Sequence, residues 1–158
     1  MITFTLDGRP VALDVPAHWT LLRALRDGAG CTVVKHGCGE GVCGACAVRV
    51  DGVGVNSCSM LAPQVEGASV ETAIGLTAPD GSLHPLQRLF VEHGAVQCGF
   101  CTPGMLIAVL DAVESGSAST TAEIRAALAG NLCRCTGYAG IVAAAEAYRD
   151  LVASGGAS

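Results

Sequence analysis

Four cysteines in the first half of the chain have the spacing of a metal site. Cys38, Cys43 and Cys46 form a C-x4-C-x2-C arrangement, and Cys58 follows further along the chain. Thiolates at this plant-type spacing ligate [2Fe–2S] clusters. The loop is also rich in glycine, at positions Gly37, Gly39, Gly41 and Gly44. Glycine permits the positive φ values and the close approach that a loop wrapped around a bulky cluster needs. A tetrahedral zinc site needs only four thiolates, usually on two short knuckles, so the pattern favours iron–sulfur over zinc.

A second set of cysteines lies in the other half of the chain. Cys98 and Cys101 form C-x2-C, and Cys133 and Cys135 form C-x-C. A C-x2-C pair beside a helix start can be a thioredoxin-like redox pair, but the strand-helix-strand context is missing. Each pair precedes a predicted helix, whose positive dipole end favours thiolates. We therefore expect both turns to meet in a second metal centre, and the spacing alone leaves iron–sulfur and zinc open. The four histidines lie outside both cysteine patterns, so a Rieske centre is not expected.

Composition narrows the class of protein. The chain has 158 residues, 51% of them hydrophobic and 15% charged, with a net charge of -5. This excludes disorder, which needs low hydrophobicity and high net charge. The sequence has no basic stripe of the kind that a nucleic-acid-binding protein carries, so that class is set aside. The longest apolar run, Met105–Leu110, is far short of the roughly 20 residues that a membrane span needs.

The amino terminus lacks a basic opening, an apolar export region and twin arginines, which predicts a cytoplasmic protein. Nine cysteines in a reducing compartment point to metal binding rather than to disulfides. After two sets of four, Cys31 is left over, and we interpret it as a small buried hydrophobe.

The first 75 or so residues predict strands, turns and one helix. Apolar residues alternate in 2–6 and again in 11–15, around an Asp7-Gly8 hairpin turn. Thr20 can cap a short helix that ends near Gly28. A second hairpin is expected over 47–55, and a last strand over 69–72. Together they predict a small half-open sheet curled over a helix.

The second half has helical spacing after a polar, turn-rich linker at 76–83. One helix opens at Pro85, with Leu86, Leu89, Phe90 and His93 on one side. The next helix is predicted to have Thr102 as its N-cap and Pro103 at its first helical position. Thr120 and Glu123 fit a capping box for a helix over 124–128, and a last helix is expected over 140–152. Four short helices predict a compact bundle. The expected domains are thus 1–75 and 84–158, in an α+β chain.

Three stretches in this order carry a family resemblance. They are Gly37-Cys-Gly-Glu-Gly-Val-Cys-Gly-Ala-Cys46, Gln97-Cys-Gly-Phe-Cys-Thr-Pro-Gly104 and Asn131-Leu-Cys-Arg-Cys-Thr-Gly-Tyr138. Together they resemble the small iron–sulfur subunit of the molybdenum hydroxylases, the family of xanthine dehydrogenase, aldehyde oxidoreductase and carbon monoxide dehydrogenase. The resemblance covers nearly the whole chain. It implies a plant-ferredoxin-like β-grasp domain, then a four-helix bundle, each holding one [2Fe–2S] cluster.

The resemblance also implies a place in a larger enzyme. Relatives relay electrons from molybdopterin in a large subunit to FAD in a medium subunit, often within a dimer of heterotrimers. Cys98, Cys101, Cys133 and Cys135 would bind the cluster nearer the pterin, which Gln97 and the Cys135 region would contact. The set formed by Cys38, Cys43, Cys46 and Cys58 would bind the cluster nearer the flavin.

Catalysis would then reside in the partners, and this chain has neither a nucleotide-binding glycine loop nor an obvious acid–base pair. Carbon monoxide dehydrogenase small subunits typically carry another triplet where this chain has Gly39-Glu40-Gly41, so we expect a purine, another N-heteroaromatic or an aldehyde as substrate. The alternatives are a carbon monoxide dehydrogenase small subunit, a free-standing two-cluster ferredoxin and a zinc-stabilised interaction domain. A free-standing ferredoxin would be expected to carry a more acidic surface.

Overall fold

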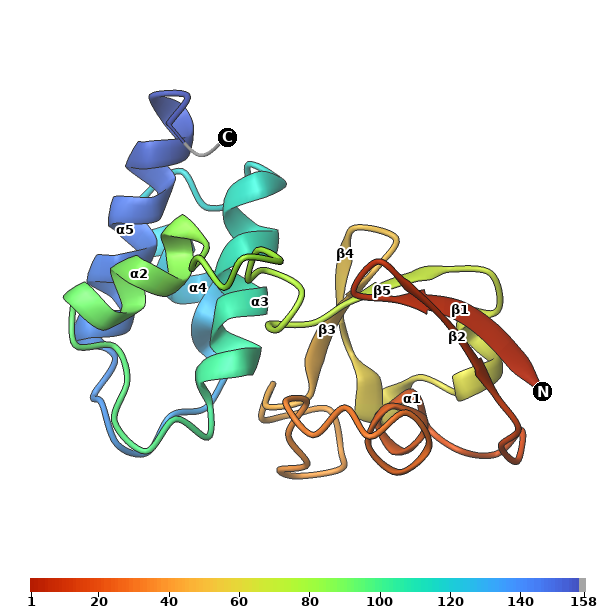
Figure 1. The fold of residues 1–158 in the computed structure, drawn as a ribbon. Helices are drawn as coiled ribbons and strands as arrows, with labels where there is room; N and C mark the ends of the chain where they lie inside the picture. The colour runs from red at the N-terminus through yellow and green to blue at the C-terminus, as the bar shows by residue number, and fades with distance from the viewer. Residues whose placement is uncertain (157–158) are drawn as a thin grey trace.

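The first half of the chain folds into a five-stranded mixed sheet with the order β2-β1-β5-β3-β4. The computed structural model describes residues 1–156 (Figure 1). The strands are β1 (Ile2–Leu6), β2 (Arg9–Leu13), β3 (Ala47–Val50), β4 (Val53–Asn56) and β5 (Ser69–Glu71). β1 runs parallel to β5, and the other neighbours are antiparallel.

Both predicted hairpins are confirmed, because each turn has the Asp-Gly pair that its backbone needs. Asp7 and Gly8 have φ values of 48° and 76°, and Asp51 and Gly52 have 49° and 81°. A two-residue turn with both φ values positive matches the right-handed twist of the flanking strands. The second hairpin matters for the site, since its two strands carry a cysteine at each open end.

A short helix packs its apolar side against the sheet. α1 (Leu21–Arg23) begins where predicted, because the Thr20 Oγ1 accepts a hydrogen bond from the Arg23 N–H at 3.3 Å. It continues as a π-helical turn, η1 (Ala24–Gly28), and ends at the predicted glycine. Leu21 and Leu25 are fully buried in the core beneath the strands, and Cys31 joins the same core. This supports the interpretation of Cys31 as a buried hydrophobe.

The second half is helical, as predicted, and its helices pack on one another. They are α2 (Pro85–Glu92), α3 (Thr102–Glu114), α4 (Thr121–Ala127) and α5 (Ala139–Ala153). α5 contacts each of the other three, so the core gathers along it. Phe90, Met105, Ile141 and Tyr148 are among its buried side chains. Together with the sheet, these helices make an α+β fold.

Two helix starts and one helix end differ from the prediction. α3 begins at Thr102, with Cys101 as its N-cap, because the Cys101 carbonyl already accepts the Met105 N–H at 2.9 Å. α4 begins at Thr121 because the Thr120–Glu123 capping box, which is confirmed, fixes its first turn. His93 is exposed and caps the C-terminus of α2 instead of lying on its buried side.

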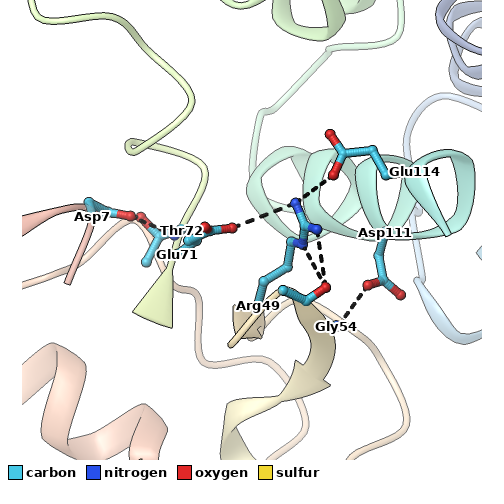
Figure 2. Close-up of polar contacts among 8 residues, drawn as sticks. Asp7, Arg49, Gly54, Glu71, Thr72, Asp111 and Glu114 are labelled. Carbon is cyan, nitrogen blue, oxygen red and sulfur yellow. Dashed lines mark hydrogen bonds and ion pairs between the residues drawn. The ribbon is translucent and has the colours of Figure 1, made fainter. Parts of the chain in front are cut away.

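The two halves meet where α3 lies against the hairpin of β3 and β4 (Figure 1). The Arg49 guanidinium lies 2.8 Å from a Glu114 carboxylate oxygen on α3 and 3.6 Å from one on Glu71 (Figure 2). The Gly54 N–H donates to the Asp111 Oδ1 at 2.8 Å. A Cβ on residue 54 would lie 2.8 Å from the Asp111 carboxyl carbon, so glycine permits this approach. These contacts fix the sheet relative to the helices.

The segment that connects the two halves is held in place by hydrogen bonds just after β5. The Thr72 backbone N–H and side-chain hydroxyl donate to the two Asp7 carboxylate oxygens at 2.7 and 2.8 Å (Figure 2). Residues 76–83 then form turns and coil up to α2. The domain boundaries 1–75 and 84–158, with this segment as linker, stay a prediction. No helix in the described part of the chain is long and apolar enough to cross a membrane.

Candidate metal centres

The first cysteine loop has the left-handed backbone that its glycines were predicted to permit. Gly39, Gly41 and Gly44 have φ values of 72°, 78° and 67°. A Cβ on Gly37 would lie 2.7 Å from the Cys43 Sγ, so that glycine is needed for space. The loop therefore closes tightly around its own thiols.

Backbone N–H groups of this loop point at sulfur atoms. The Glu40 N–H donates to the Cys38 Sγ at 3.3 Å, and the Cys38 N–H donates to the Cys43 Sγ at 3.4 Å. Hydrogen bonds from the backbone of Glu40 and Val42 lower the pKa of the Cys38 thiol to about 6. The thiolate is the ligand form of cysteine, so the loop favours the state that binds metal.

The register of the second hairpin brings Cys46 and Cys58 together. Ala47 pairs with Asn56 at its open end, which places the preceding Cys46 beside the turn η2 (Ser57–Ser59). The Ser57 hydroxyl, which is fully buried, donates to the Cys46 carbonyl at 2.7 Å and fixes this turn. Burial raises the pKa of the Cys46 thiol to about 11, while the Cys58 backbone opposes this rise and the Cys58 thiol adds to it.

The second cysteine set also converges, on the side of the helices where α3 and α5 begin. The Cys135 Sγ lies 3.5 Å from the Cys98 Sγ, although the two residues are 37 positions apart. A disulfide would require about 2.05 Å, and all nine cysteines are free. The backbone N–H of Phe100 lowers the pKa of Cys98, whereas contact with Cys98 raises that of Cys135.

Cys101 and Cys133 form the other pair of this set. Burial raises the pKa of the Cys101 thiol to about 12, and the hydrogen-bonded Cys133 thiol contributes. Although burial opposes it, hydrogen bonds from Thr136 lower the pKa of Cys133 to about 7. The Thr136 Oγ1 lies 3.1 Å from the Cys133 Sγ. Each pair thus contains a thiol whose surroundings favour the thiolate.

Each set of four cysteines consists of two neighbouring pairs of thiols. A two-iron cluster needs such a donor set, with one pair of thiolates for each iron. Cys38 neighbours Cys43 and Cys46 neighbours Cys58, while the second set pairs as described above. A [2Fe–2S] cluster takes four cysteines across two irons, whereas zinc needs three or four ligands around one ion. The residues present therefore fit [2Fe–2S] clusters better than zinc.

The remaining residues from the sequence analysis lie on the surface around the second set. Gln97 is exposed beside Cys98, and Cys135 is exposed as well. Phe100 lies between Cys98 and Cys101 in the sequence and Leu132 precedes Cys133, and they are 48% and 56% exposed, so each cysteine turn carries an exposed apolar side chain. The predicted pterin contact of Gln97 and Cys135 is thus open to a partner.

Sequence reasoning missed three residues that join the two cysteine sets. Asn131 is buried between the halves, and its side-chain N–H groups donate to carbonyls of both. The Leu132 N–H donates to the Cys43 carbonyl at 2.9 Å. The Tyr138 hydroxyl contacts the backbone of both Asn131 and Cys133. Asn131 and Tyr138 belong to the third stretch that carries the family resemblance, yet no local pattern indicated which distant atoms they contact.

The fold and the paired thiols define a two-site iron–sulfur protein, and comparison with known families agrees. Residues 4–74 match the 2Fe-2S iron-sulfur cluster binding domain, and residues 72–146 match the [2Fe-2S] binding domain. The chain is 46% identical to the nicotine 6-hydroxylase small subunit of Paenarthrobacter nicotinovorans, over 90% of this chain and 86% of that one. It is 44% identical to the nicotinate dehydrogenase small FeS subunit of Eubacterium barkeri, over 90% of both chains.

Solved structures give the same result. A chain of quinoline 2-oxidoreductase from Pseudomonas putida 86 is 41% identical, with a TM-score of 0.90, over 98% of this chain and 96% of that one. Aldehyde oxidoreductase from Desulfovibrio desulfuricans is 39% identical, with a TM-score of 0.88, over 98% of this chain and 17% of that one. The chain belongs to the small [2Fe–2S] subunits of the molybdenum hydroxylase family. Its role is electron transfer in an oxidoreductase, and catalysis is not its own.

Proposed function

We propose that eight cysteines of this chain hold two [2Fe–2S] clusters. Cys38, Cys43, Cys46 and Cys58 hold the first, and Cys98, Cys101, Cys133 and Cys135 hold the second. The observation that carries this is the pairing of thiols from distant segments, above all Cys98 with Cys135 at 3.5 Å. Each cluster, when bound, takes up and releases one electron. The family fold supports a plant-ferredoxin-like β-grasp around the first set and a four-helix bundle around the second.

We also propose the order of the relay. The second set faces the molybdopterin of a large subunit, and the first set faces FAD in a medium subunit. Support comes from exposure: Cys98 and Cys135 reach the surface among Phe100 and Leu132, as a contact with a partner requires. Val42, next to Cys43, is 58% exposed and offers a separate apolar contact beside the first set.

A purine, another N-heteroaromatic or an aldehyde is the proposed substrate class of the complex. Relatives that act on nicotine and nicotinate by name support the N-heteroaromatic reading. The Gly39-Glu40-Gly41 triplet of the first loop argues against carbon monoxide. We further propose a dimer of heterotrimers in the cytoplasm, a reducing compartment that suits nine cysteines that form no disulfide.

Metal analysis and electron paramagnetic resonance (EPR) test the function. The chain, purified with the proteins that accompany it, should contain four irons and give two distinct signals on reduction. Proteins carrying molybdenum and FAD should accompany it in stoichiometric amounts. A free-standing ferredoxin would give the iron but no partners. Stoichiometric zinc without iron would overturn the proposal.

Gln97→Ala tests the pterin contact. Gln97 is exposed and belongs to neither set of four thiols, so both EPR signals should keep their shapes and intensities. Reduction of the second cluster by substrate should slow, or the large subunit should bind more weakly. The unchanged signals serve as the internal control. A variant with wild-type rates and wild-type affinity for the large subunit would contradict the contact.

A further inference from the structure

A hydroxyl group lies against one sulfur atom of the second cysteine set. The Thr136 Oγ1 is 3.1 Å from the Cys133 Sγ. The same oxygen accepts a hydrogen bond from the Tyr138 backbone N–H at 3.2 Å. Tyr138 is the N-cap of α5, so the Thr136 side chain is bonded both to the C-x-C turn and to the start of this helix.

The direction of the contact with sulfur follows from the protons that are present. A hydroxyl group has one proton to donate and two lone pairs with which to accept. The Tyr138 N–H occupies one of these lone pairs. A cysteine that binds metal is a thiolate and has no proton of its own. When Cys133 is a ligand, the proton in this contact is therefore that of the Thr136 hydroxyl, which donates to the sulfur.

The backbone after Thr136 holds the hydroxyl in this position. Gly137 and Tyr138 have left-handed φ values of 64° and 68°, which turn the chain back towards Cys133 before α5 begins. The Tyr138 hydroxyl accepts the Cys133 backbone N–H at 2.7 Å. One side chain of this turn thus fixes the Cys133 backbone, and another contacts its sulfur.

Cys133 lies on the inner side of its set, where a lost donor is harder to replace. Its side chain packs against the hydrophobic core of the helices, whereas Cys98 and Cys135 are exposed. Water can hydrogen-bond to an exposed sulfur in place of a protein donor. A hydrogen bond away from water is also electrostatically stronger. The half-buried Thr136 hydroxyl therefore acts on the sulfur with little competition from solvent.

We propose that the Thr136 hydroxyl raises the reduction potential of the second iron–sulfur site by donating a hydrogen bond to the Cys133 sulfur. The inference rests on the proposed function of the second cysteine set. On reduction the site takes up one electron from a partner subunit, and no covalent bond or proton changes place. The added negative charge is shared by the sulfurs, and a donor binds the more negative state more strongly. The hydrogen bond therefore stabilises the reduced site, which raises its potential.

The first cysteine set has a longer contact of this kind. The Ser59 Oγ lies 3.6 Å from the Cys58 Sγ. Shorter contacts with sulfur in the first loop come from the backbone, where the Glu40 N–H donates to the Cys38 Sγ at 3.3 Å and the Cys38 N–H to the Cys43 Sγ at 3.4 Å. Removing a side-chain hydroxyl should therefore affect the second site more than the first.

Thr136→Val tests the proposal in the purified complex. Valine keeps the branched shape of the side chain and replaces the hydroxyl with a methyl group. Thr136→Ser keeps the hydroxyl and serves as the rescue variant, and Ser59→Ala is the matched control at the first set. Both EPR signals of each variant are titrated against electrode potential. Electron–nuclear double resonance in H2O and D2O then measures which exchangeable protons couple to each signal.

In Thr136→Val, the midpoint potential of one signal should fall. A tenfold change in the equilibrium between the site and a fixed redox couple is about 59 mV for one electron, and we expect a shift of about this size. The same signal should lose one exchangeable-proton coupling, while the other signal keeps its potential. Thr136→Ser should restore both values. Ser59→Ala should leave that signal unchanged and shift the other signal by less.

Unchanged potentials in Thr136→Val with four irons bound would overturn the inference, and so would an equal fall in Thr136→Ser. A purely structural role of Thr136 would lower the thermal stability, because Tyr138 loses its acceptor, without moving either potential. If Thr136→Val lacks iron, Thr136→Ala, which leaves space instead of filling it, takes its place with the same expectation. Loss of iron from both would show that the hydroxyl holds the site instead of tuning it, which also overturns the inference. Absence of iron from the unaltered complex would instead refute the proposed function.

Discussion

Glycine determines how closely the two cysteine loops approach each other. A Cβ on Gly104 would lie within van der Waals overlap of the Gly44 carbonyl oxygen, because helix α3 begins directly against that loop. Gly44 itself has a φ of 67° and faces Asn131. The glycines of the first loop were predicted from their alternation with cysteines. The need for glycine at position 104 was not predicted, because the atom that it approaches belongs to Gly44, far away in the sequence.

Gly104→Ala should therefore destabilise the protein by roughly 1–3 kcal/mol, the usual cost of forcing an extra methyl group into a packed contact. Gly130→Ala is the control, because nothing lies within 4 Å of a Cβ at that position and its φ is not left-handed. Thermal unfolding of the two variants gives the comparison. Equal midpoints would contradict the close approach of α3 to the first loop.

The cysteine ligand candidates were identified from spacing alone because iron–sulfur loops place their ligands close together in sequence. The partners of Asn131 and Leu132 could not be identified in this way. The Asn131 side chain bonds to Gly44, 87 residues away, and backbone amides leave no signature of their distant acceptors. Side chains that organise a site from another part of the chain need the folded structure to be found.

Among the helices, the ends were predicted well where the cap residue was of a common type. Thr20 and the Thr120–Glu123 capping box are confirmed. The cap of α2 was missed because histidine is seldom an N-cap. The His84 Nδ1 accepts the Leu86 N–H at 3.2 Å, which requires the neutral ring. Burial and the nearby Arg88 lower its pKa below the usual 6.5, and Glu114 opposes them.

The cap predicts a pH dependence of stability. Because the pKa of His84 is lower in the folded state, the unfolded state binds more protons, and stability rises with pH. The contribution of His84 is complete above pH 6.5 and is lost as the pH falls through the lower folded value. Asparagine caps a helix without titrating in this range. His84→Asn should therefore reduce the loss of thermal stability between pH 8 and 5.5, and an unchanged loss would contradict the neutral cap.

Over the entire chain, the packing of the sheet against the helices depends on charged residues that sequence patterns did not single out. Arg49 is only 14% exposed and binds carboxylates from β5 and α3. The α+β composition and the order of elements were predicted from periodicity, which is a local property. The relative placement of the two halves was not predicted, because it depends on interacting residues such as Arg49 and Glu114 that lie far apart in the sequence.

Arg49→Ala should lower the free energy of unfolding by roughly 1–3 kcal/mol, since it leaves Glu114 beside a partly buried interface without a cation. Arg149→Ala is the matched control, because Arg149 pairs with Asp150 at 2.7 Å within a single helix. That variant should cost well under 1 kcal/mol, because the partner Asp150 is 69% exposed and water screens the pair. Thermal midpoints of both variants provide the measurement. A control that is equally destabilised would show that the Arg49 pair has no special role in joining the halves.

The unequal exposure of the thiols has a consequence for biogenesis. Cys46 and Cys58 are buried beneath the first loop, whereas Cys98 and Cys135 reach the surface. Exposed thiolates are the first to meet oxygen and chelators. We therefore expect a newly made chain without its companions to lose iron first from its carboxy-terminal half. On the proposed function, companion subunits that cover this surface would also shield its thiols, so we expect iron insertion and complex assembly to be linked in time.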